Sequence, residues 1–491
     1  MSNEFAKKTT QGIGWNYLSF GLRKILSLAI VSILAHILSP ENFGIVALAT
    51  LTIDYLSVFN DFGLGAAFIQ QRDNVETTAN TAFTLNIFIG ITLTLITFLI
   101  APLVATFFKE PLVSPILRWL GLNFLINAIG SVHKARLQRE LNFRLKMIPE
   151  LGNVFSRGIL SVSLALTGFG VWSLVYGHLL GVILETILLW KVVPWRPYFE
   201  LNAYLAKKLF NYGLQVMSVN ALAIFGDSFD YFLIGIFFNS ASLGIYTLAY
   251  RLPEMLIINT LWVLAAVFFP AFASIQTQPK ELQKSFLASI KYVQLIVTPI
   301  CLGLIVAAEP IIRVVFGDQW LDSIPIMRIL SAYALVISVG FHVGDVYKAI
   351  GRPDILIKIS TPIFIIRIIA LWIGAQYSLI GVALAHLVAG AIEVGVRLFV
   401  AFKIMNIGFP DLVKELRAYI GGIALTMFAL PALYLTKETP PIVQLTSVIL
   451  AGVIGYFAFL WIAEYQSLLN ALKIIGIPRT KSPKHIESKL D

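Results

Sequence analysis

The chain has few charged residues and almost no cysteine. Asp, Glu, Lys and Arg make up only 13% of its 491 residues, and Cys301 is the single cysteine. Soluble domains carry about 25% charged residues, so this composition excludes an ordinary water-soluble protein. A single cysteine also excludes an internal disulfide bond. Because Cys301 lies in an apolar stretch, we expect it to be a small core residue.

Several functional motifs are also missing. The chain has no G-x-x-x-x-G-K-[ST] phosphate loop, which argues against ATP binding of that kind. The connections between apolar stretches are too short for a catalytic domain outside a membrane, so we expect no enzyme. The net charge of +10 is dispersed among these connections, which does not suggest a nucleic-acid partner. We expect no cofactor or metal, and we interpret the scattered histidines as packing residues: His36, His133, His178, His342 and His386.

Long apolar runs dominate the rest of the chain. Hydrophobic residues make up 58% of it, and the runs extend over about 20 residues or more, whereas a barrel strand would give about 10 residues of alternation. These features predict an all-α integral membrane protein with about fourteen transmembrane helices. The expected spans are 13–38, 43–69, 80–107, 114–132, 149–168, 170–190, 209–238, 242–271, 286–307, 323–347, 355–375, 378–402, 416–435 and 441–463.

The distribution of basic residues predicts the orientation in the membrane. The first eight residues are polar and the apolar stretch after them is too long for a signal-peptide core, so we expect this span to be retained. If the N-terminus is cytoplasmic, most Lys and Arg residues fall on the cytoplasmic side, as the positive-inside rule requires. An even number of spans then places both termini in the cytoplasm.

An internal repeat accompanies these spans. L-S-P-E-N-F-G-I-V-A-L-A (38–49) aligns without gaps with F-N-S-A-S-L-G-I-Y-T-L-A (238–249), so that Gly44 matches Gly244. P-I-L-R-W-L (115–120) matches P-I-M-R-I-L (325–330) after small insertions. The repeating unit contains six spans, and an even number gives both copies the same orientation, as in parallel-repeat transporters.

The repeat predicts the domain organisation. We expect two pseudo-symmetric six-helix lobes over 1–200 and 201–408, two C-terminal helices over 409–465, and a basic cytoplasmic tail over 466–491. Two similar lobes around a central cleft are typical of transporters that expose a midplane site to each side in turn, the mechanism of alternating access.

Several cations are predicted to lie deep in the membrane. With a rise of about 1.5 Å per residue, Arg23, Lys24, Arg251 and Arg367 fall near the middle of their spans, and Arg157 is shallower. A charge at this depth costs at least a few kcal/mol unless it is paired or solvated. Adjacent cations point about 100° apart on a helix, so one acid cannot neutralise both Arg23 and Lys24. An anionic ligand such as a diphosphate would explain the pair.

Polar and acidic residues share this depth and leave alternatives open. Asp54, Asn220, Asp227, Asp230 and Glu254 could line a polar cavity or bind a coupling ion, H⁺ or Na⁺, and a structural role is equally consistent with the sequence. Arg251 with Glu254, and Glu393 with Arg397, have the spacing of local ion pairs within a helix. Arg23 and Lys24 could instead pair with Asp54 or Asp227 across helices.

The motifs together resemble a known family. They are L-S-P-E-N-F-G-I-V-A-L-A, F-N-D-F-G-L-G-A-A-F-I-Q-Q (59–71), A-R-L-Q-R-E-L-N-F-R (135–144), G-F-G-V-W-S-L-V-Y-G-H-L (168–179) and E-P-I-I-R-V-V-F-G-D-Q-W (309–320). The chain resembles the polysaccharide transporters, or oligosaccharide flippases, of the multidrug/oligosaccharidyl-lipid/polysaccharide exporter superfamily. Colanic-acid-exporter-like lipopolysaccharide flippases are the most similar branch.

The resemblance implies a flippase for an undecaprenyl-diphosphate-linked oligosaccharide in the bacterial inner membrane. It implies a cationic cavity for the diphosphate and sugar, which here would use Arg23, Lys24, Arg251, Arg367 and Arg157. The implied partners are this lipid-linked oligosaccharide, membrane lipids, and a polysaccharide polymerase and glycosyltransferases. A lipid II flippase is the main alternative, and a cation-coupled multidrug exporter is a weaker one because such exporters usually have fewer spans.

Overall fold

In the computed structural model, the described residues are 2–60, 63–71 and 73–463, and every regular element in them is a helix. The predicted all-α fold is therefore confirmed. The helices up to residue 253 are α1 (Ser2–Ile37), α2 (Pro40–Ser57), α3 (Leu64–Gln70), α4 (Val75–Phe107), α5 (Val113–Arg139), α6 (Phe143–Leu166), α7 (Val171–Val192), α8 (Ala203–Asp227), α9 (Phe229–Phe237) and α10 (Ser240–Pro253). The later ones are the π-helix η1 (Glu254–Ile258), α11 (Asn259–Ser274), α12 (Pro279–Val306), α13 (Ala308–Val315), the 3₁₀-helix η2 (Asp318–Trp320), α14 (Ser323–Gly340), α15 (Val343–Ala349), α16 (Pro353–Tyr377), α17 (Leu379–Met405), α18 (Phe409–Glu415), α19 (Ala418–Leu435) and α20 (Pro441–Ala463).

Eleven helical stretches among the described residues are long and apolar enough to cross a membrane. The chain is therefore a multi-pass membrane protein. Three predicted spans, 43–69, 149–168 and 209–238, do not coincide with any of the eleven. The first and third are each divided between two helices, and the second carries Glu150 and Arg157. The number fourteen stays a prediction.

The helices pack into two compact units. The first contains Met1–Met255, Val315–Ile326 and Ser360–Ala389, and the second contains Leu256–Val314, Met327–Ile359 and the chain from Gly390 onward. Two long helices, α16 and α17, contribute residues to both units. The division into lobes 1–200 and 201–408 stays a prediction, and the expected tail 466–491 lies outside the described residues.

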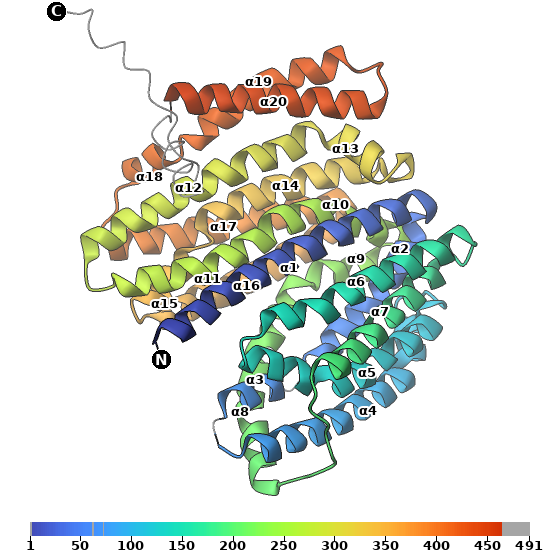
Figure 1. Cartoon of the computed structure of the whole chain (residues 1–491). Helices are drawn as coiled ribbons and strands as arrows, with labels where there is room; N and C mark the ends of the chain where they lie inside the picture. The colour runs from blue at the N-terminus through green and yellow to red at the C-terminus, as the bar shows by residue number, and fades with distance from the viewer. Residues whose placement is uncertain (1, 61–62, 72, 464–491) are drawn as a thin grey trace, which may run out of the picture. The chain divides into compact units, whose positions relative to one another are not determined.

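Within the first unit, α4 packs along α5, α6 along α7, and α1 along α6 (Figure 1). Small residues bring α6 and α7 close together. A Cβ atom added at Gly177 of α7 would lie 2.9 Å from the carbonyl oxygen of Arg157. Gly177 and Gly181 are four residues apart on one face of α7, the small-xxx-small pattern of closely packed membrane helices.

The aligned repeat segments form equivalent helices, and these helices contact each other. Ser39 and Asn239 both act as N-caps, each accepting a hydrogen bond from the backbone N–H three residues later. The two helices that follow, α2 and α10, cross at Gly44 and Gly244. A Cβ atom at Gly44 would lie 1.6 Å from the carbonyl oxygen of Ser240, so only glycine fits this crossing.

The repeat-equivalent helices α2 and α10 are also interrupted near the same position of the repeat. α2 ends at Ser57 and α3 begins at Leu64, with Gly63 in the left-handed region at φ 63°. Two hundred residues later, α10 gives way to the π-helix η1 (Glu254–Ile258). Interrupted helices and π-turns in membrane proteins occur most often beside functional cavities, which draws attention to these two levels.

The second unit contains its own apolar core. In it, α12 packs against α19, and α19 packs along α20 (Figure 1). Cys301 of α12 is fully buried, as predicted. Arg397 and Glu393 of α17 form the predicted local ion pair, with 2.6 Å between Nη2 and Oε1.

Candidate functional site

The two adjacent cations of α1 have different surroundings, all within the first unit. Arg23 lies 3.5 Å from Glu150 of α6, measured from Nη2 to Oε2, and only 7% of the Glu150 side chain is exposed. Ser19 donates to the same carboxylate oxygen at 3.0 Å, and Lys146 Nζ is 3.6 Å from the other oxygen. Glu150 therefore anchors α1 to α6. Of the predicted alternative partners, Asp54 is not the acid that Arg23 contacts, and the side chain of Asp227 lies outside the described residues.

Lys24 has no such partner among the described residues, because none of their ion pairs within 4.0 Å includes it. Its Nζ lies 5.5 Å from the ring centroid of Phe20, a cation–π distance. The charges of Glu254, Arg251 and Arg23 all act on it. The ammonium is thus half-buried in a neighbourhood that contains more positive than negative charge.

Arg251 of α10 connects to α1 beside this lysine. Its Nη2 donates to Ser27 Oγ at 3.0 Å, and Ser27 is three residues after Lys24 on the same helix. Among the described residues, Arg251 therefore donates its hydrogen bond to α1 and not to Glu254, its predicted local partner. Arg157 of α6 belongs to the same neighbourhood, because its charge and that of Arg251 repel each other. We call Lys24, Arg157, Arg251 and Arg23 the cationic cluster.

Arg367 has a different set of partners. Its Nη2 is 2.8 Å from His386 Nε2, and Nδ1 of the same ring is 3.6 Å from Asp230 Oδ2. Because a guanidinium can only donate, Nε2 accepts and the ring proton lies on Nδ1, facing the carboxylate. The Asp230 carboxylate also accepts from Tyr246 OH at 2.8 Å. This buried polar cluster joins α16, α17, α9 and α10.

The remaining predicted residues lie beside these groups or outside the described part. Asp54 of α2 is exposed, and its charge acts on Tyr55 and Tyr231. Tyr231 also experiences the charges of Asp230, Glu254 and Arg251, so it lies near residues of both clusters. The side chains of Asn220 and Asp227 lie outside the described residues.

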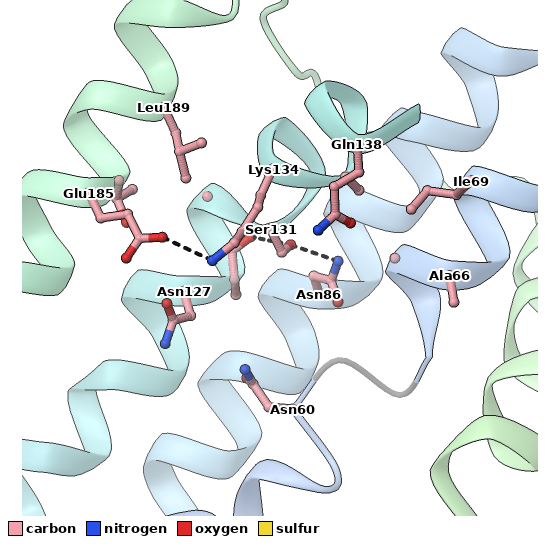
Figure 2. A pocket seen from close by; sticks show the side chains of 15 residues that line it. Asn60, Ala66, Ile69, Asn86, Asn127, Ser131, Lys134, Gln138, Glu185 and Leu189 are labelled. Carbon is pink, nitrogen blue, oxygen red and sulfur yellow. Dashed lines mark hydrogen bonds and ion pairs between the residues drawn. The ribbon is translucent and has the colours of Figure 1, made fainter. Parts of the chain in front are cut away.

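A polar pocket lies elsewhere in the first unit, among α3, α4, α5 and α7. It encloses about 450 Å³. Lys134 and Glu185 form an ion pair across it at 3.0 Å, and Asn86 donates to Ser131 at 2.9 Å (Figure 2). Nothing in the sequence patterns predicted this pocket, because its residues come from separate motifs.

Comparison with known proteins gives the family. The family described as "Polysaccharide biosynthesis protein" matches residues 33–325, more than half of the chain. The chain belongs to this family. The teichuronic acid biosynthesis protein TuaB of Bacillus subtilis (strain 168) is 27% identical over 79% of this chain and 81% of its own. The lipopolysaccharide biosynthesis protein WzxC of Escherichia coli (strain K12) is 25% identical over 87% and 86%.

Solved structures confirm the fold of this member of the polysaccharide biosynthesis family. The lipid II flippase MurJ in an inward closed conformation matches with a TM-score of 0.73 and 19% identity, over 92% of this chain and 99% of that one. An inward-facing multidrug transporter of the MATE family and the MOP superfamily matches with a TM-score of 0.65 and 16% identity, over 78% and 94%. Both matches concern the arrangement of helices.

Proposed function

We propose that this protein is a flippase that moves an undecaprenyl-diphosphate-linked oligosaccharide across the bacterial inner membrane by alternating access. The cargo would be a repeat unit of O-antigen, exopolysaccharide or capsule. The single observation that carries the proposal is the cationic cluster, in which three helices bring four cations together. Family membership supports it, because the related TuaB and WzxC are named for the biosynthesis of cell-surface polymers.

The charge balance of the cluster fits a diphosphate. Glu150 is shared by Arg23 and Lys146, and Glu254 is the other carboxylate near Lys24. The cations outnumber the acids, which leaves positive charge that a bound anion would neutralise. A diphosphate accepts hydrogen bonds from guanidinium and ammonium groups together, and these charge-assisted bonds replace its hydration shell. The prenyl chain would stay in the lipid phase, where it needs no polar partner.

The buried polar cluster supplies a candidate for ion coupling. The side chains of Asp230 and His386 are each 1% exposed. A change in the charge of either residue would alter its interaction with Arg367 and with the other residue of the pair. We propose that H⁺ or Na⁺ drives transport through this cluster, with Asp54, Asp227, Asn220 and Glu254 as further polar groups. Both termini would be cytoplasmic, and glycosyltransferases and a polymerase would act before and after the flippase.

Transport in proteoliposomes tests the proposal. The purified chain is reconstituted with a fluorescent prenyl-diphosphate sugar, and flipping is followed as loss of fluorescence to a membrane-impermeant quencher, with and without an imposed H⁺ or Na⁺ gradient. We expect Lys24→Ala and Arg251→Ala each to slow flipping about tenfold, the effect of one charge-assisted hydrogen bond. Lys437→Ala, a lysine that is exposed near the start of α20, is the matched control and should flip at the wild-type rate.

Three further outcomes decide between the alternatives. Full flipping by the Lys24→Ala/Arg251→Ala double variant would exclude the cluster as the diphosphate site. Exchange of Arg251 and Glu254 separates ligand binding from a structural pair, because restored function in the exchanged protein would favour the pair. A chain that flips lipid II and no other prenyl-diphosphate sugar would instead be a peptidoglycan-precursor flippase.

A further inference from the structure

The polar pocket of the first unit is chemically unlike the cationic cluster. Eight of its fifteen lining residues are polar, and amides and hydroxyls predominate: Asn60, Asn86, Asn127, Ser131, Lys134, Gln138, Glu185 and Thr186. The one ion pair, Lys134 with Glu185, makes its charge balance neutral. Asn153 donates to the second oxygen of Glu185 at 2.7 Å, so both carboxylate oxygens are already used.

The pocket residues include hydrogen-bond acceptors that no group among the described residues satisfies. Asn86 is 2% exposed and its Nδ2 donates to Ser131, but its Oδ1 has no partner among the described residues. Oδ1 of Asn60 is in the same situation. Figure 2 shows Asn60, Asn86 and Asn127 on one side of the Lys134–Glu185 pair. Buried acceptors without donors are rare in folded proteins, and here two of them belong to residues that line one cavity.

The position of the pocket also suggests a binding site. Asn60, Ala66 and Ile69 come from the interruption between α2 and α3 and from α3 itself. Discontinuous helices in transporters place polar groups beside their ligands. A volume of about 450 Å³ is within the range of small-molecule sites, about 300–1,000 Å³.

The lining excludes most ligand classes. A phosphate only accepts hydrogen bonds and could not satisfy the Asn60 and Asn86 oxygens. A metal ion or Na⁺ would be repelled by the Lys134 ammonium and would leave most of the cavity empty. An apolar chain would bury the amides without partners. A neutral group with many hydroxyls both donates and accepts, and therefore matches amide oxygens, amide nitrogens and the lysine at once.

We propose that this pocket binds a sugar ring of the cargo, separately from the diphosphate site. The juxtaposition of unpartnered amide oxygens with a neutral ion pair in one cavity is what assigns it to a sugar. The inference rests on the proposed function for the source of the sugar. The small residues Gly65, Ala66 and Ala128 leave space for the sugar ring, and the amides provide the hydrogen bonds.

Saturation-transfer NMR on the purified full chain in detergent tests the proposal directly. The probes are the methyl glycosides of glucose, galactose, rhamnose and N-acetylglucosamine, each added alone. We expect saturable transfer to at least one of them. Asn86→Leu removes an unpartnered oxygen, and Ala66→Phe fills the cavity without altering its polar groups. Each should weaken the signal about fivefold, the effect of one neutral hydrogen bond or more. Thr92→Leu, on the exposed face of α4, is the matched control and should keep the signal.

Three outcomes would overturn the inference. If none of the four glycosides gives a saturable signal, or if both pocket variants keep it, the pocket holds water only. If NaCl in place of KCl raises the unfolding temperature of the wild type but not of Asn86→Leu, the site binds a cation. Flipping in proteoliposomes is measured separately. If the protein binds a sugar but does not flip the lipid, only the proposed function fails. If Ala66→Phe flips at the wild-type rate, only the role of this pocket fails.

Discussion

Neighbouring residues of one helix can differ completely in role. Arg23 and Lys24 share a depth, but the helix turns by about 100° between them, so they face different elements. Arg23 lies against Glu150, whereas Lys24 has no ion-pair partner among the described residues and is acted on by the charges of Glu254 and Arg251. The first contact is one that a helix-packing ion pair makes, and the second leaves a cation for a ligand. We therefore propose that Arg23 has mainly a structural role and Lys24 mainly a binding role.

Glu150 should be more important for stability than a surface acid. Glu150→Gln removes the charge that two cations and Ser19 share, so we expect a loss of about 1–3 kcal/mol in the free energy of unfolding. Thermal unfolding of the purified chain in detergent measures it. Glu76→Gln is the matched control, because Glu76 also pairs with an arginine, Arg136, but is 63% exposed. Equal unfolding temperatures for the two variants would show that Glu150 is not an anchor.

Depth and charge grouped five cations, but one of them, Arg367, contacts His386 instead, and the partners of the others were not predicted. Lys24, Arg157 and Arg251 were predicted to share one region of the molecule, and their charges do interact. Ser27 and Glu150 were missed because partner choice depends on how each helix is rotated, which composition does not record. His386 was interpreted as a packing residue, since no second histidine stood at ligand spacing. In the structure, His386 instead contacts Arg367 and Asp230.

At the scale of helices, the predicted spans that are missing from the apolar helical stretches are the more polar ones. The three predicted spans absent from the eleven apolar helical stretches contain α2 with α3, α6, and α8 with α9. These elements carry Asp54, Arg157 and Asp230, and one of their interruptions borders the polar pocket. The gapless repeat was more informative, because it aligned Gly44 with Gly244 before their contact was known. It could not predict the interruptions, which depend on the backbone hydrogen-bond pattern.

The glycine crossing of α2 and α10 should not tolerate a single methyl group. Gly44→Ala would place Cβ 1.6 Å from the Ser240 carbonyl oxygen, and Gly244→Ala would place it 2.0 Å from that of Pro40. The helices would have to separate, and we expect a loss of about 1–3 kcal/mol or more in unfolding free energy. Gly303→Ala is the control, since its Cβ meets no atom within 4 Å and alanine favours a helix. Thermal unfolding compares the three, and a Gly44→Ala chain as stable as Gly303→Ala would contradict the crossing.

For the whole molecule, composition predicted a helical membrane protein, and the repeat predicted two related halves. Packing groups part of the later sequence, Ser360–Ala389, with Met1–Met255, because α16 and α17 each contribute residues to both units. The two six-helix lobes stay a prediction. The residues of both proposed sites all lie in the first unit. The predicted number of spans and their orientation are still to be measured.

Single-cysteine labelling tests the number of spans and their orientation together, because Cys301 is the only cysteine and is fully buried. In a Cys301→Ala background, we expect an impermeant maleimide to label Lys109→Cys and Lys437→Cys in intact cells. Glu140→Cys and Arg352→Cys should react only after permeabilisation. Wild-type Cys301 should not react in the folded chain. Each of these four introduced cysteines replaces an exposed residue between helices.

The comparison of Glu140 with Arg352 tests whether an even number of spans lies between them. Six predicted spans separate the two positions, and among them are 149–168 and 209–238, which are not among the apolar helical stretches. If every one of the six crosses the membrane, an even number returns the chain to the same side, and both cysteines are cytoplasmic. If exactly one of these two polar elements fails to cross, Arg352→Cys becomes accessible from outside while Glu140→Cys does not. Such a split would contradict the fourteen-span topology and the parallel orientation of the two repeats, because the second repeat would then be inverted in the membrane.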